Sequence, residues 1–131
     1  MKLEYLAKAN AGGSGDDLIR LYDFTAVEVQ LLAHKIKDSL VLKGKALQME
    51  PLEFINPVNC KLNLTLSDTD NGIHQDAPNR FTCALTRSGY LRMVDLMEPL
   101  MKEGSVGFQW LYDLSSDATP TEFLLSPNGN W

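Results

Sequence analysis

Residues 60–86 read CKLNLTLSDTDNGIHQDAPNRFTCALT, and this stretch predicts the centre of the fold. From Cys60 to Ser67, apolar and polar residues alternate, which places the two kinds of side chain on opposite faces of a β-strand. The segment from Phe81 to Thr86 repeats the alternation. Asn71-Gly72 is a preferred pair for a two-residue hairpin turn, in which both residues must adopt positive φ. We therefore expect a β-hairpin that closes at Asn71-Gly72.

The turn also predicts the register of this hairpin. It places Leu62 opposite Phe81 and Cys60 opposite Cys83, with all four side chains on one face of the sheet. The polar run from Gln75 to Pro78 leaves an alternative open, because it fits a wider loop or a bulge as well as a strand. Without a secretion signal, we expect the two cysteines to be buried thiols rather than a disulfide.

The bulk composition is that of one soluble globular domain spanning residues 1–131. Hydrophobic residues make up 44% of the 131 residues and charged residues 22%. We expect no membrane segment, because no apolar run reaches the roughly 18 residues that a spanning helix needs. The first residues carry no apolar signal segment, so the expected location is cytoplasmic. The net charge of −5 makes the domain acidic and disfavours nucleic-acid binding, which depends on clustered Lys and Arg.

Two segments predict amphipathic helices. The first begins with Thr25 as N-cap and Glu28 three residues later, which is the pattern of a capping box, and it ends near Gly44. The second follows Thr86 or Ser88 as cap, and Pro99 should kink or shorten its last turn. Each helix has one apolar side. These residues are Val29, Leu32, Ala33, Ile36 and Leu40 in the first helix, and Tyr90, Met93, Val94, Met97, Leu100 and Met101 in the second.

Further strands are predicted on both sides of the hairpin, at residues 2–9, 18–22, 46–50, 106–112 and 121–125. In residues 106–112, Val106, Phe108, Trp110 and Tyr112 share a face that we expect in the core; if exposed, it could stack a base or a sugar. Alternating strands predict a sheet with one solvated face. The expected fold is α+β: an antiparallel or mixed sheet of about six or seven strands with two helices packed on one face.

The sequence contains no pattern typical of a metal or cofactor site, and we expect neither. With Gly72 at the sixth position of a calcium loop, Pro78 falls at the position that requires a carboxylate. The two cysteines show no zinc-binding spacing. As nucleophiles they would be poor, because burial raises a thiol pKa. Whether the chain is an enzyme therefore stays open.

Three functional hypotheses remain. The first is a non-catalytic regulatory module that binds a protein partner, with Met93, Met97, Met101 and Trp131 as candidate contact residues; the methionine stripe fits plain core as well. The second is a small-molecule binder or enzyme with a pocket between sheet and helices, for which His74, Arg80, Tyr90 and Arg92 are candidate ligand-binding residues. The third is a homo-oligomer joined through a strand edge.

Overall fold

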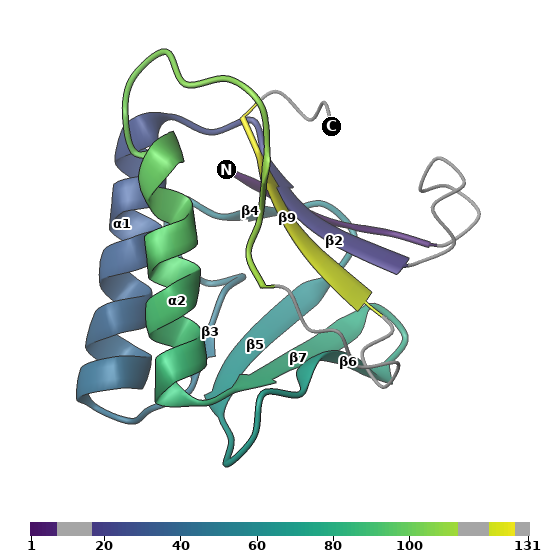
Figure 1. The fold of residues 1–131 in the computed structure, drawn as a ribbon. Coiled ribbons are helices and arrows are strands. Elements are labelled where there is room, and N and C mark those ends of the chain that lie inside the picture. Colours follow the sequence, from purple (N-terminus) through teal and green to yellow (C-terminus); the bar gives the residue numbers. More distant parts are fainter. Residues whose placement is uncertain (8–16, 113–120, 128–131) are drawn as a thin grey trace.

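The computed structural model describes residues 1–7, 17–112 and 121–127, and it has the expected α+β architecture. Two helices, α1 (Ala26–Ile36) and α2 (Arg87–Met97), lie side by side on one face of a curved mixed sheet (Figure 1). A π-helical turn (Lys37–Leu42) extends α1, and a 3₁₀ turn (Glu98–Leu100) follows α2. Pro99 was expected inside the helix, which was predicted to end at Gly104. The α-helix instead ends at Met97, and Pro99 lies in the 3₁₀ turn that follows, so the shortening expected from the proline is confirmed.

The sheet contains more strands than expected. Its order is β3-β5-β7-β6-β9-β2-β1-β4, and β8 pairs with β9 outside this path. Three neighbouring pairs are parallel, namely β5 with β7, β2 with β9 and β1 with β4, and the remaining pairs are antiparallel. The strands are β1 (Lys2–Leu6), β2 (Asp17–Tyr22), β3 (Leu47–Gln48), β4 (Asn56–Pro57), β5 (Lys61–Leu66), β6 (Gly72–Ala77), β7 (Arg80–Leu85), β8 (Gln109–Trp110) and β9 (Thr121–Ser126).

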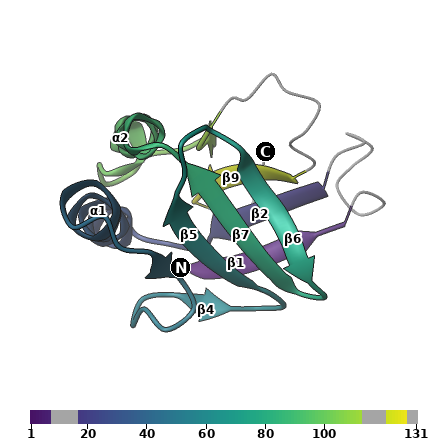
Figure 2. The ribbon, with the colours of Figure 1, turned by 90° about the horizontal axis from the view of Figure 1, so that it is seen from below.

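The sheet curls into a half-barrel. Figure 2 shows β5, β7 and β6 on one side of the curl and β9, β2 and β1 on the other. The ring of Tyr5 on β1 lies 4.7 Å from the ring of Phe81 on β7, although three strands separate β1 from β7 in the sheet order. The two sides of the curled sheet therefore contact each other on the concave face, in addition to contacting the helices. These contacts give a small domain one continuous core.

The pairing inside residues 60–86 differs from the expected hairpin. β5 and β7 are parallel, with Leu62 beside Phe81 as predicted, but Cys83 lies between Leu64 and Ile73 instead of opposite Cys60. The antiparallel partner of β7 is β6, which lies on the other side of β7 from β5. The predicted hairpin between residues 60–67 and 81–86 is therefore wrong.

Backbone geometry explains this difference. Gly72 has φ 78, but Asn71 does not adopt positive φ, so the two-residue turn that requires both cannot form. The tight connection is instead Pro78-Asn79 between β6 and β7, where Asn79 has φ 62. A register shift between Gln75 and Ala77 is the bulge that the sequence left open as an alternative.

The loop between β5 and β6 anchors the start of α2. Asp70 Oδ1 accepts hydrogen bonds from the backbone N–H and the hydroxyl of Thr86, at 2.8 and 2.9 Å. The Thr86 hydroxyl oxygen in turn accepts from the Gly89 N–H at 3.0 Å, so Thr86 is the N-cap. A Cβ at Gly89 would lie 2.5 Å from Asp70 Oδ1, which explains glycine at this position. These bonds hold the loop that follows β5 at the end of β7, an arrangement that agrees with the parallel direction of the two strands.

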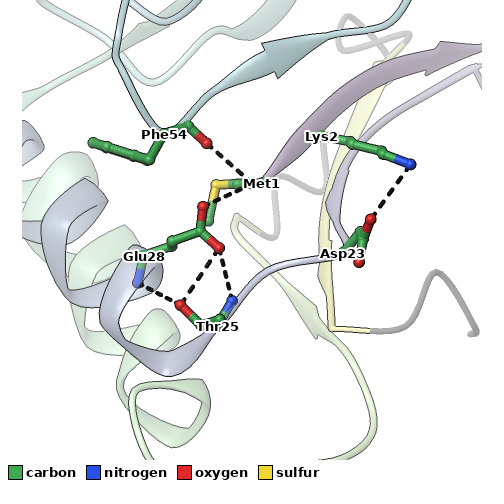
Figure 3. A network of polar contacts seen from close by, with 6 residues as sticks. All are labelled: Met1, Lys2, Asp23, Thr25, Glu28 and Phe54. Atoms are coloured by element: carbon green, nitrogen blue, oxygen red, sulfur yellow. Dashed lines mark hydrogen bonds and ion pairs between the residues drawn. The ribbon is translucent and has the colours of Figure 1, made fainter.

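The start of α1 is fixed by the capping box that the sequence predicts (Figure 3). The Glu28 carboxylate accepts from the Thr25 N–H at 2.9 Å and from the Met1 amino group at 2.9 Å. The same amino group donates to the Phe54 carbonyl oxygen at 3.0 Å. Burial of Glu28 favours its neutral form, but the hydrogen bonds from Met1 and Thr25 outweigh it and lower the carboxyl pKa.

The aromatic segment is only partly a strand. Residues 109–110 form β8, which pairs antiparallel with β9. Val106 and Phe108 are 81% and 45% exposed, so the expectation that the face lies in the core is wrong for these two residues. Trp110 is half-buried, and Tyr112 packs against the core. Only Gln109 and Trp110 carry strand structure because Gly107, with φ 97, interrupts the extended backbone before them.

Candidate functional site

A row of polar side chains crosses the outer face of the sheet, the face turned away from the helices. Neighbouring strands place Gln48 beside Asn63, Asn63 beside Thr82, and Thr82 beside His74. Leu62, next to Asn63 in the chain, is fully buried in the core. Because side chains alternate along a strand, the row must point the other way. Four polar residues from four strands thus meet on one surface.

A hollow of about 410 Å³ lies over this face, and we call it the outer-face hollow. It combines cationic, anionic and amide groups in one depression. Its lining residues are Gln48, Glu50, Pro51, Lys61, Asn63, Asp76, Arg80, Phe81 and Thr82.

Asn63 supplies the floor with an unused polar atom. Its Oδ1 is buried and has no hydrogen-bond partner among the described residues. Leaving such an atom without any donor costs about 1–3 kcal/mol, so Asn63 Oδ1 needs a donor from outside the described residues, either a water molecule or a bound group. A leucine would suit the strand better and would avoid this cost. The asparagine therefore points to an external hydrogen-bonding group as the reason for its presence.

Two cations stand at one end of the hollow. Lys61 on β5 and Arg80 on β7 are direct neighbours in the parallel ladder, and both are exposed. Neither makes an ion pair with another described residue. Like charges directly opposite each other destabilise a sheet. An anion bound between the two side chains would remove this repulsion.

Carboxylates flank the floor. Glu50 Oε1 accepts a hydrogen bond from the Leu62 N–H at 3.1 Å, on the side of β3. Asp76 Oδ2 accepts a hydrogen bond from the Thr82 hydroxyl, on the side of β6. Both carboxylates keep further lone pairs for a donor in the hollow, since an ionised carboxylate has about four acceptor sites. The hollow therefore offers acceptors at its floor and flanks and donors at one end.

A second hollow of about 400 Å³ adjoins the first, and Lys61 and Arg80 line both. Its other lining residues are less charged and include Pro57, Val58 and Pro78. Val58 is 49% exposed there. The two cations thus stand between a polar depression and a more apolar one.

The structure separates the four predicted ligand-binding residues. His74 and Arg80 share the outer face, and Arg80 lines the outer-face hollow. Arg92 lies elsewhere, in a hollow that also includes Trp110 and Glu122. Tyr90 is fully buried, and its hydroxyl donates to the carbonyl oxygens of Thr65 and Cys83 at 2.7 and 2.9 Å. Burial also raises its pKa. As placed, Tyr90 joins α2 to the sheet and reaches no hollow.

Two of the three predicted partner-binding residues that the structure describes are buried. Met93 and Met97 are 0% exposed, so they belong to the core, which is the alternative that the sequence left open. Met101 is half-buried, and its carbonyl oxygen accepts from the Gln30 side chain at 2.8 Å. Trp131 lies outside the described residues. Core side chains fill much of the space between the sheet and the helices. A hollow of about 400 Å³ nevertheless lies between Arg92 and Leu96 of α2 and the strands β8 and β9, where a pocket was expected.

The cysteines are buried thiols. Burial raises the pKa of Cys83 to about 12, and burial together with the charges of Glu4 and Glu50 does the same for Cys60. Neither is therefore ready to act as a nucleophile. The described ranges contain no group of three or more His, Cys, Asp or Glu that could hold a metal ion. No helix in the same ranges is both long and apolar enough to span a bilayer.

Sequence reasoning missed Lys61, Asn63 and Thr82 as site residues. They occupy the polar positions of the alternation in residues 60–86, which places them on the outward face of the sheet. Alternation alone does not distinguish a binding surface from an ordinary solvated sheet face, because both have the same pattern. Comparison of the chain with protein-family models, curated proteins and solved structures gave no significant match.

Proposed function

We propose that the chain is a non-catalytic interaction module that binds a protein partner through the outer-face hollow. The observation that carries this proposal is Asn63, whose buried side-chain oxygen has no hydrogen-bond partner within the described ranges. It lies beside two cations, Lys61 and Arg80, that form no ion pair within those ranges. A bound partner would supply a hydrogen-bond donor for Asn63 and a negative charge for the two cations. The overall negative charge would also steer the domain towards a basic partner surface.

The character of the hollow favours a protein over a small molecule. Small-molecule sites are usually lined mainly by apolar groups and enclose most of the ligand. Here the lining is largely polar, and Gln48, Lys61, Asp76 and Arg80 at its rim are exposed. The adjoining hollow beyond Lys61 and Arg80 also allows a longer ligand to continue across the surface.

The geometry gives less support to self-association through a strand edge. β3 and β4, at the two ends of the sheet path, contain two residues each. Short edge strands offer few unpaired backbone groups to a second chain.

A peptide-display selection on the immobilised domain tests the proposal. Selected peptides should bind the wild-type domain and lose at least about tenfold in affinity, or about 1.4 kcal/mol, on Asn63→Leu. Lys35→Glu on the exposed side of α1 is the control and should retain binding. Peptides that bind Asn63→Leu as well as the wild type, or no enrichment at all, would contradict the proposal.

A further inference from the structure

We infer that the outer-face hollow recognises an extended segment of a partner protein in which a basic and an acidic side chain are two residues apart. This inference rests on the proposed function and names the chemistry of the bound segment. It follows from the separation of charges within the hollow, which the strand register defines.

The anionic group of the ligand is assigned to Lys61 and Arg80. They are paired neighbours on adjacent strands, and both are exposed and without a described ion pair. A carboxylate between them would accept charge-assisted hydrogen bonds from both side chains. It would also relieve the repulsion between the two positive charges.

The cationic group is assigned to the floor. Asn63 Oδ1 is a buried acceptor without a partner, and the carboxylates of Glu50 and Asp76 stand on its two flanks. An ammonium group from the ligand would meet the opposite charge of these two carboxylates, and a rotation of the Asn63 amide would bring Oδ1 within its reach as an acceptor.

The spacing of these two subsites matches an extended peptide. Lys61 and Asn63 are two residues apart on β5, and Arg80 and Thr82 are two apart on β7. Each pair is therefore separated by about 6.6 Å along its strand. Side chains at positions i and i+2 of an extended peptide share a face at the same separation. A segment with one residue between its acidic and basic side chains can fill both subsites together.

Synthetic peptides test the inference on the ¹⁵N-labelled domain at low salt. The probe is acetyl-Val-Thr-Glu-Val-Lys-Thr-Val-amide, together with the peptide in which Glu and Lys are exchanged, because the direction of binding is open. Three comparison probes are the Gln-Val-Gln peptide, a peptide with adjacent Glu and Lys, and the free dipeptide alanylalanine. NMR titration follows the backbone amides of Lys61, Asn63, Arg80 and Thr82.

We expect one of the two charged peptides to shift these amides to saturation, with at least fivefold weaker binding of the neutral and adjacent-charge peptides. If the neutral peptide binds equally well at these amides, the inference is wrong and the proposed function stands. Saturation by alanylalanine without the longer peptides would show a small zwitterion as the ligand and would overturn the inference. If no synthetic peptide binds but display-selected peptides do, the charge pattern is again wrong.

Discussion

Lys61 and Arg80 are paired neighbours on two parallel strands, and their positive charges face the same side of the sheet. Such an arrangement opposes folding, because like charges at directly opposed positions weaken a sheet by a few tenths of a kcal/mol to about 1 kcal/mol. It lies next to Asn63, whose buried oxygen has no partner. Residues that lower the stability of the folded domain are typical of functional surfaces. At such positions the residue type is explained by binding and not by folding.

Lys61→Glu should therefore stabilise the domain while it abolishes binding. The substitution turns a repulsive pair with Arg80 into an attractive one, and the expected gain in unfolding free energy is at most about 1 kcal/mol. Urea denaturation measures this gain. Lys35→Glu makes the same charge change on exposed α1 and should not show it. A loss of stability in Lys61→Glu would mean that the two cations do not repel each other in the folded domain.

Asn63→Leu should leave the domain as stable as the wild type or stabilise it by up to about 1 kcal/mol. The leucine removes a buried oxygen without a partner, and an apolar group of similar size pays no such desolvation cost. Thermal or urea unfolding of the purified variant provides the measurement. A decrease of more than about 1 kcal/mol would show that Asn63 has a structural hydrogen bond.

Tyr90→Phe should weaken folding and leave peptide binding unchanged. The hydroxyl of Tyr90 donates to two carbonyl oxygens between α2 and the sheet, so its removal should cost about 1–3 kcal/mol. Denaturation gives the stability and peptide titration gives the affinity. If a fully folded Tyr90→Phe domain binds the peptide more weakly than the wild type, Tyr90 takes part in ligand binding, which would contradict its purely structural role.

The stability that Glu28 contributes should depend on pH. Its pKa in the folded domain lies below the ordinary glutamate value of 4.5, because the ionised carboxylate accepts hydrogen bonds from Met1 and Thr25. The contribution is thus complete above pH about 4.5 and is lost as the pH falls through the lower folded-state pKa. Glu28→Gln keeps a capping side chain and removes the charge. In urea denaturation, the variant should have a lower free energy of unfolding than the wild type at pH 7, and this difference should shrink as the pH falls through the Glu28 pKa. A difference that does not change with pH would exclude an effect of the charge.

Both cysteines should be inaccessible to a thiol reagent in the native domain and fully reactive after denaturation without reductant. Cys60 and Cys83 are 4% and 0% exposed, and the strand register places Cys83 beside Leu64 and Ile73. Dye labelling followed by mass spectrometry counts the modified thiols. A denatured, unreduced chain that takes up no dye would reveal a disulfide.

Local patterns predicted both helices and the strands β1, β2, β5, β7 and β9, because each of these depends on neighbours in the chain. The capping box at Thr25 and Glu28 and the left-handed backbone at Gly44, with φ 67, are of this kind. Strand pairing was harder, because the direction of β7 relative to β5 depends on Asp70, which binds Thr86 sixteen residues away. Alternation alone could not reveal that bond. It identified the outward face of Asn63 and Thr82 but not which strands would bring them together.

The most direct test of the account compares two double variants with the same total charge. A display-selected peptide is titrated by fluorescence anisotropy against wild type, Lys61→Glu/Arg80→Glu, and Lys35→Glu/Arg87→Glu, whose side chains are exposed on the helices. We predict at least about a tenfold loss of affinity for the first double variant and a change within about twofold for the second. Equal affinity for all three proteins, or an equal loss in both double variants, would contradict a binding site in the outer-face hollow.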